Sequence, residues 1–200
     1  MNKIFLFSVL IIGFSSVNAQ WGDDLADINA YLSIGYGYMS PSSKGLDDFT
    51  SSYNNQRKSI LSKEMESVGM WGMTYNTGIV MRGLLLEFGY TGRNGKMSSE
   101  ADPAKVTPGS LTKREIDLKL GSYNFTFGVL LGENMLYLGP IFELSINSID
   151  FETVNRNGKS YNVEMDTWIG GNVGAMIIFG NIARSGGFLT IKPYYSFGIT

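Results

Sequence analysis

The sequence predicts an all-β protein whose antiparallel strands run up and down and curl into a barrel. Three observations support this fold class. The chain carries 25 glycines and 13% aromatic residues, a composition typical of strands and tight turns. Apolar residues alternate with small or polar residues along seven segments, as in strands that have one apolar face. The connections between these segments alternate between long and short, as in barrels.

Each segment separates its apolar side chains from its small and polar ones at a period of two. In LLLEFGYTGR (84–93), Leu86 and Phe88 share one face, whereas Glu87 lies on the other. The predicted strands are about Ala30–Met39, Met70–Val80, Leu84–Arg93, Thr112–Leu130, Met135–Phe151, Tyr161–Phe179 and Phe188–Ile199. Seven strands are visible. Because single-chain bacterial barrels have an even number, an eighth is expected in the complete protein, beyond Thr200.

The fourth segment contains a change of phase. Apolar residues occupy even positions from Ile116 to Leu120 and odd positions from Phe125 to Val129. A glycine lies beside the change, and glycine within a strand often marks a β-bulge. The pattern therefore predicts a bulge near Gly121–Asn124.

The N-terminus has the three parts of a signal peptide. Lys3 supplies the positive charge, Ile4–Phe14 the apolar core, and Val17-Asn18-Ala19 the small-residue cleavage site. The apolar run is too short to span about 30 Å of hydrocarbon. We therefore expect residues 1–19 to be a signal peptide and residues 20–200 to be the barrel domain, lacking its last strand. No other long apolar run follows, which excludes a helical membrane protein.

The connections at 40–67 and 94–111 are long, those at 81–83, 131–134 and 180–187 are short, and 152–160 is intermediate. If the N-terminus lies in the periplasm, the longer loops all fall outside the cell and the short turns inside. Leu46, Phe49 and Tyr53 within the first loop have helical spacing. A short amphipathic helix there either binds a partner or closes the rim, or simply packs the loop's own apolar side chains.

The character of the polar faces indicates which side of the barrel points outward. A soluble, lipocalin-like barrel would turn its apolar face inward around a ligand and carry many charges outside. Here the polar faces are mostly Gly, Ser, Thr and Asn, which suit the crowded interior of a narrow barrel. Aromatic residues lie near the ends of the apolar faces, as in interfacial girdles: Tyr36, Tyr38, Trp71, Tyr90, Phe179 and Phe197. The pattern favours a transmembrane β-barrel with its apolar faces toward lipid.

Charged residues on the polar faces should then meet in the interior. The candidates for this lumenal network are Glu87, Arg93, Asp117, Lys119, Glu143 and Lys192. A hairpin centred near Pro103 would place Glu87 opposite Lys119 and Arg93 opposite Lys113. A buried carboxylate needs a partner, so Glu87 is expected to form an ion pair. The network serves either as a proton or ion path or as a plug that keeps the barrel shut.

With the signal peptide and the loop pattern, the segments LLLEFGYTGR and IKPYYSFGI make residues 29–200 resemble the OmpA/OmpX-like outer-membrane β-barrel domain proteins of the porin superfamily. This resemblance implies the outer membrane of a Gram-negative cell, with outer-membrane lipid and lipopolysaccharide as surroundings. The family includes structural anchors, adhesion proteins and narrow channels, and no motif in this chain selects among them.

Several functions are disfavoured by composition. The net charge of −2 gives no basic surface for nucleic acid. The chain has neither cysteine nor histidine, which removes thiolate zinc sites and the usual general base of small outer-membrane hydrolases. The glycine-rich run Gly170–Gly174 lies within a strand and is followed by no helix, unlike a phosphate-binding loop. We expect no enzyme activity, no cofactor and no metal site.

The sequence therefore predicts a structural or surface-interaction role, exercised through residues 40–67 and 94–111 on a protein or surface partner. One alternative is a narrow passive channel for ions or small solutes. A second is a soluble, lipocalin-like barrel that binds an apolar ligand.

Overall fold

The structure is a computed structural model of the chain and describes residues 9–17, 28–40, 44–66, 69–133, 135–154, 160–164, 167–180 and 186–198. The predicted cleavage site at Ala19 and the connecting residues 155–159 and 181–185 lie outside the described residues. All of its strand pairs are antiparallel, which confirms the all-β fold class. In the described part of the chain, no helix is long and apolar enough to cross a bilayer.

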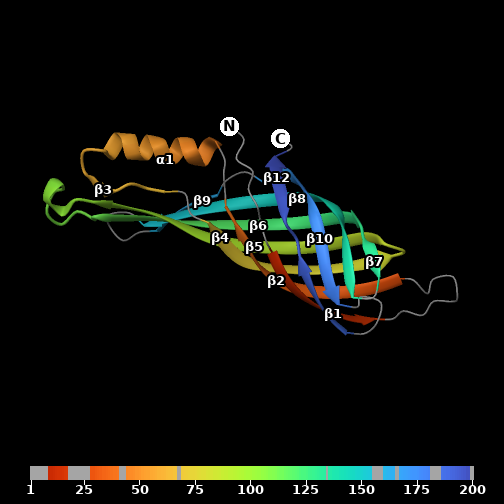
Figure 1. Cartoon of the computed structure of the whole chain (residues 1–200). Helices are drawn as coiled ribbons and strands as arrows, with labels where there is room; N and C mark the ends of the chain where they lie inside the picture. Colours follow the sequence, from red (N-terminus) through yellow and green to blue (C-terminus); the bar gives the residue numbers. More distant parts are fainter. Residues whose placement is uncertain are drawn as a thin grey trace.

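Strands, several of them long, make up most of the chain (Figure 1). They are β1 (Val9–Val17), β2 (Ile28–Met39), β3 (Leu61–Lys63), β4 (Met70–Met81), β5 (Leu84–Ala101), β6 (Lys113–Val129), β7 (Leu131–Glu133), β8 (Leu136–Val154), β9 (Ser160–Glu164), β10 (Trp168–Gly180), β11 (Gly186–Ile191) and β12 (Tyr194–Gly198). The helix α1 (Lys44–Arg57) confirms the amphipathic helix predicted in the first long connection, and the 3₁₀ turn η2 (Pro103–Lys105) follows β5.

The strands β2, β4, β5, β6, β8 and β10 pair in chain order and form a strongly curled sheet. β10 then pairs with β11 and β12, which together correspond to the predicted seventh strand. These two halves are separated at Lys192–Pro193, where proline lacks the amide hydrogen that a continuous ladder requires. The antiparallel up-and-down arrangement predicted for these strands is therefore confirmed.

The strand β1 lies between the first and last strands of this sheet. Its residues pair with β2 on one side and with β11 on the other. The strand pairing therefore forms a closed ring. A barrel that lacks its last strand would leave β2 and β11 as free edges, whereas here each of them pairs with β1. Unpaired backbone groups favour any extended partner within reach, and Val9–Val17 supplies one. Cleavage of the signal peptide stays a prediction.

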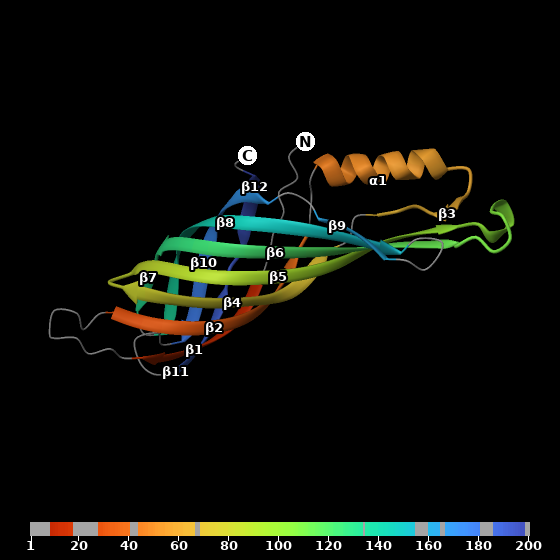
Figure 2. The same ribbon diagram turned by 180° about the vertical axis from the view of Figure 1, so that it is seen from behind.

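The strands β5, β6 and β8 extend well beyond the rest of the sheet, and α1 and β3 accompany them (Figure 2). β5 continues to Ala101, so much of the predicted loop 94–111 is strand. We call the projecting part, residues 94–120 and 148–154, the extension. The ladder between β5 and β6 runs from Leu84–Val129 to Glu100–Lys113 without a register shift, so the β-bulge predicted near Gly121–Asn124 is wrong.

The reversal of burial along β5 and β6 explains that error. Exposed residues are apolar in the barrel, as at Phe88, but charged in the extension, as at Lys96. Inward residues change the opposite way, from buried Thr91 to buried Met97. The change in apolar pattern therefore reflects a change in what surrounds the strand, because the backbone keeps one phase throughout.

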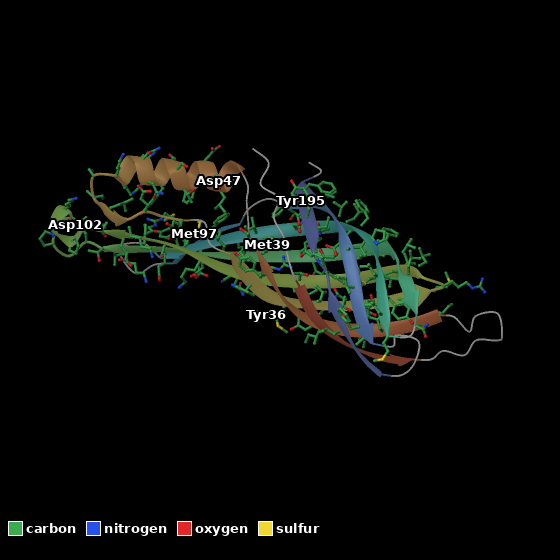
Figure 3. The ribbon with its side chains drawn as sticks, viewed as in Figure 1. Tyr36, Met39, Asp47, Met97, Asp102 and Tyr195 are labelled. Atoms are coloured by element: carbon green, nitrogen blue, oxygen red, sulfur yellow. The ribbon has the colours of Figure 1, made fainter. Side chains whose placement is uncertain are left out.

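Two apolar clusters occupy opposite ends of the molecule. The turn-end cluster, near the short connections, comprises Tyr31, Val80, Leu85, Leu130, Ile141, Met176, Ile178 and Phe188. The loop-end cluster, between α1 and the extension, comprises Leu46, Met65, Met70, Met97, Ile116, Leu118 and Leu120. In Figure 3, Met97 marks the inner side of the extension and Asp102 its far tip.

Candidate functional site

The charged residue Glu87 is held inside the barrel by two partners from distant parts of the chain. Lys192 Nζ forms an ion pair with Glu87 Oε1, and both side chains are almost completely buried. The hydroxyl of Tyr31 donates a hydrogen bond of 2.6 Å to Glu87 Oε2. Strands β2 and β5 and the junction of β11 and β12 thus meet at one carboxylate. This satisfies the expectation that Glu87 is ion-paired, but the partner is Lys192.

The predicted pairings of Glu87 with Lys119 and of Arg93 with Lys113 are wrong. Glu87 lies opposite Thr126, and Arg93 lies opposite Leu120. The hairpin of β5 and β6 is centred between Val106 and Thr107 instead of at Pro103, because Pro103 sits in η2 at one side of the connection.

Two predicted members of the interior network lie elsewhere. Lys119 is on the outer side of the extension and donates to Glu152 at 2.8 Å. Asp117 is also there, 3.5 Å from Lys96. Lys119 and Asp117 lie on the face of the β5–β6 pair opposite to Arg93. In the extension that face points outward and carries the charges. Glu87, Arg93, Glu143 and Lys192 are the four that face inward.

Charges on the outer face of the extension stabilise one another weakly. The hydrogen bond and the charge of Lys113, with a further contribution from Lys96, lower the pKa of Glu115 from its ordinary value of 4.5. The hydrogen bond to Glu152 raises the pKa of Lys119. Glu115 therefore favours the folded extension above its ordinary pKa, and this contribution disappears as the pH falls through the folded value. Both groups are solvent-exposed, so each effect is small.

A polar layer surrounds Glu143 near the Glu87–Lys192 pair. Glu143 Oε2 accepts a hydrogen bond of 2.9 Å from Thr126, and its Oε1 accepts one from Asn172. Hydrogen bonds also join small polar side chains of neighbouring strands: Thr74 with Thr91, Asn124 with Thr91, and Asn76 with Ser33. Within β6, Ser122 donates to Asn124. This layer fills the middle of the barrel with satisfied polar groups.

Arg93 reaches across the interior from β5 and is less completely satisfied. Its Nη2 donates a hydrogen bond of 2.7 Å to the hydroxyl of Tyr194 on β12. Its Nε is buried and has no hydrogen-bond partner among the described residues. The whole side chain is only 3% exposed, so this donor is withdrawn from solvent. Buried donors without partners are rare in folded proteins, so this one requires a physical explanation.

A cavity of about 800 Å³ opens above this polar layer at the loop end. Its inner part is polar and includes Thr91, Arg93, Asn124, Glu143, Asn147 and Asn172. Its outer part is apolar and includes Leu46, Phe49, Ile116, Leu120, Ile149, Phe151 and Trp168. Leu46 and Phe49 come from the beginning of α1, so this helix borders the mouth of the cavity. Tyr195, labelled in Figure 3, lines the cavity from β12.

Sequence reasoning missed Tyr31 and Tyr194 as interior partners. Tyr31 is in phase with the inward residues Ser33 and Gly35, so the alternation already contained the signal for it. Tyr194 is in phase with Lys192 and Ser196, and the pairing with β10 keeps that phase across Pro193, so the alternation contained the signal here too.

The polar interior does not resemble a metal centre in composition. Within the described ranges, no group of three or more Asp or Glu side chains is placed to hold a metal ion. Its carboxylates, Glu87 and Glu143, are each engaged by hydrogen-bond donors of neighbouring strands. Comparisons with protein-family models, with curated proteins and with solved structures give no match to this chain.

Proposed function

We propose that this chain is an integral outer-membrane β-barrel protein of the OmpA/OmpX-like type, which presents a rigid interaction surface on the outer side of the membrane. The surface is the extension together with α1. The single observation that carries this proposal is the outer surface of the barrel, whose apolar band ends where the charged extension begins.

The apolar band has the height of a bilayer. Exposed large apolar side chains on β8 run from Leu136 to Ile146, and polar Ser148 follows on the same face. Eleven residues at about 3.4 Å each, tilted by about 45°, span roughly 25 Å of membrane thickness. The neighbouring strands carry the same band with Leu32, Ile34, Met73, Tyr75, Ile79, Leu84, Phe88, Phe125, Phe127, Val129, Ile169 and Val173.

Aromatic rings gather at the boundary between band and extension. Tyr36 stacks on Trp71 with centroids 5.8 Å apart, and Tyr38 contacts the same indole at 4.6 Å. On β5 and β6, Tyr90 and Tyr123 form a further pair at 5.2 Å. Tyrosine and tryptophan favour the membrane–water interface, because one end of the ring is apolar and the other binds water.

The interior argues against the alternative of a passive channel. The turn-end cluster fills one end of the barrel with apolar side chains. The Glu87–Lys192 pair and the polar layer around Glu143 fill the next part. The outward apolar band argues against a soluble, lipocalin-like protein, because that protein would expose its polar face instead.

Site-directed labelling tests the orientation directly, since the chain contains no cysteine that would react in the background. Single cysteines would replace Phe88, Thr74 and Lys96 in protein reconstituted into lipid vesicles. We expect a fluorophore at 88 to be quenched by lipid-attached quenchers, and a cysteine at 96 to react with an impermeant thiol reagent. A cysteine at 74 should do neither, because Thr74 is buried.

The same labelling experiment can also contradict the proposed membrane location. Rapid aqueous labelling at 88, without lipid quenching, would overturn the membrane proposal. Planar-bilayer recording of the same protein distinguishes the channel alternative, since a steady conductance would contradict a filled interior.

A further inference from the structure

We propose that the loop-end cavity binds a single-chain amphiphile with an acidic head group, an alkyl carboxylate, whose head contacts Arg93 and whose chain lies along the apolar wall. This binding site goes beyond the proposed surface role and depends on no partner of the extension. Its volume of about 800 Å³ lies within the range of roughly 300–1,000 Å³ typical of small-molecule sites.

Arg93 provides the reason for an anionic head group. Its guanidinium has a donor, Nε, that is buried without a partner among the described residues, and the side chain lines the cavity. Its hydrogen bond to Tyr194 fixes the guanidinium in place from the other side. A carboxylate can accept from Nε and from a second guanidinium nitrogen through two separate oxygens, and both hydrogen bonds are charge-assisted, whereas a hydroxyl offers one uncharged oxygen.

The charges around the cavity also favour an anion. The charged side chains that line it are Arg93, Arg114 and Glu143, two cations and one anion. Glu143 is already engaged by Thr126 and Asn172. Deeper in the barrel, Lys192 and Glu87 neutralise each other. One added carboxylate therefore balances the lining, whereas an added cation would increase its imbalance.

The apolar wall provides the reason for a chain. Leu120 on β6 lies opposite Ile149 on β8 in the ladder. Ile116 on β6, Phe151 on β8 and Trp168 on β10 line the same apolar wall. From Leu120 to Ile116 the strand advances four residues, roughly 13 Å at about 3.3 Å each. Polar groups at the inner end and a continuous apolar wall toward the mouth match the two ends of one linear amphiphile.

The experiment measures binding of dodecanoate carrying a bromine at its terminal carbon to the full-length protein in lipid nanodiscs. Bromine quenches nearby indoles, and Trp168 lines the cavity. The variants Trp21→Phe and Trp71→Phe leave Trp168 as the only tryptophan, so excitation at the red edge of the indole band reports on it apart from the tyrosines. We expect saturable quenching by the carboxylate, and at least tenfold weaker binding of the brominated alcohol and trimethylammonium compounds of equal length. Each methylene added should strengthen binding about fourfold until the cavity is filled.

Arg93→Gln should weaken dodecanoate binding by about tenfold to a hundredfold, the loss expected for a hydrogen bond to a charged group. Lys96→Gln is the matched control: it removes the same charge from the same strand but on the outer face of the extension, and should leave binding unchanged. Ile149→Asn should weaken binding through the chain instead of the head, and it keeps the test decisive if Arg93→Gln fails to form a heat-modifiable barrel on gels.

Two results would overturn the inference. One is equal affinity for the carboxylate, alcohol and trimethylammonium compounds, which would remove the acidic head group. The other is quenching that rises linearly with probe and ignores both substitutions, which would mean partition into the bilayer. A protein that does not enter nanodiscs at all would count against the proposed membrane location, whereas a protein that enters and does not bind would count only against this site.

Discussion

Glu87 and Lys192 show how much a single buried pair holds together. The carboxylate follows three consecutive leucines and joins β5 to β2 and to the junction of β11 and β12. Removing one partner leaves the other charge buried and uncompensated, which typically costs about 3–5 kcal/mol. We therefore expect Lys192→Met to lower the free energy of unfolding by about that amount in urea titrations of vesicle-reconstituted protein.

The double variant Glu87→Gln, Lys192→Met should be less destabilised than the sum of the two single variants, because no charge remains buried alone. Lys119→Met supplies the control, since Lys119 pairs with Glu152 on the exposed face and should cost at most about 1 kcal/mol. Additive effects of the two interior substitutions would show that Glu87 and Lys192 do not interact energetically.

For single residues, the sequence predicted which way a side chain points better than which residue it contacts. Alternation placed Glu87 on the face opposite Leu86 and Phe88, and the small polar residues of that face placed it inside. Its partner Lys192 lies 105 positions further along the chain and meets it only through the curvature of the whole sheet. No local pattern encodes that distance. The unsatisfied Nε of Arg93 was equally invisible, because satisfaction depends on every neighbour.

The helix α1 is the element attached most specifically to its surroundings. Asn54 donates a hydrogen bond of 2.9 Å to the carbonyl of Met65 and accepts one of 2.8 Å from its amide. We expect Asn54→Ala to weaken the attachment of α1 by about 1–3 kcal/mol, because two backbone groups lose their partner. Hydrogen exchange should then accelerate in residues 44–66, while β4 remains protected.

Gln56→Ala is the control for that measurement. Gln56 lies on the same helix, and its hydrogen bond to Ser52 is exposed, so its loss should leave exchange unchanged. Unchanged exchange in Asn54→Ala would show that its two hydrogen bonds do not hold the helix, and equal acceleration in both variants would show that the effect is not specific to Asn54.

The phase of β6 makes a second prediction for an element. Leu118 is buried in the loop-end cluster, whereas Lys119 beside it is exposed. Leu118→Asn should destabilise the extension by about 2–4 kcal/mol, and Lys119→Asn by much less. Local hydrogen exchange of residues 113–120 measures this. Similar exchange in the two variants would contradict the continuous phase of the strand.

The expected β-bulge shows why element-level prediction failed here. An alternation of apolar residues records which side of a strand faces water or lipid, and only indirectly records the backbone. The barrel strands are apolar outside, and the extension is apolar inside under α1, so one unbroken strand carries two opposite patterns. Strand order and the helix were predictable, because each rests on a pattern that does not cross that boundary.

At the scale of the whole molecule, β1 (Val9–Val17) lies within the predicted signal peptide, residues 1–19. Export by the predicted route removes residues 1–19 and with them the strand that pairs with β2 and β11. We expect protein extracted from outer membranes to begin at Gln20, as read by N-terminal sequencing or intact mass. Retention of residues 9–17 in the extracted protein would contradict cleavage and would keep β1 in place.

The uninterrupted ladder between β5 and β6 has a mechanical consequence. Its pairing runs from Leu84 and Val129, at the end with the short connections, to Glu100 and Lys113 without a register shift. The joint that a swinging arm would need is therefore missing from this hairpin. A load applied near Asp102 is transmitted to the barrel wall as bending of one stiff beam, so whatever grips the tip is held at a fixed height and angle above its base.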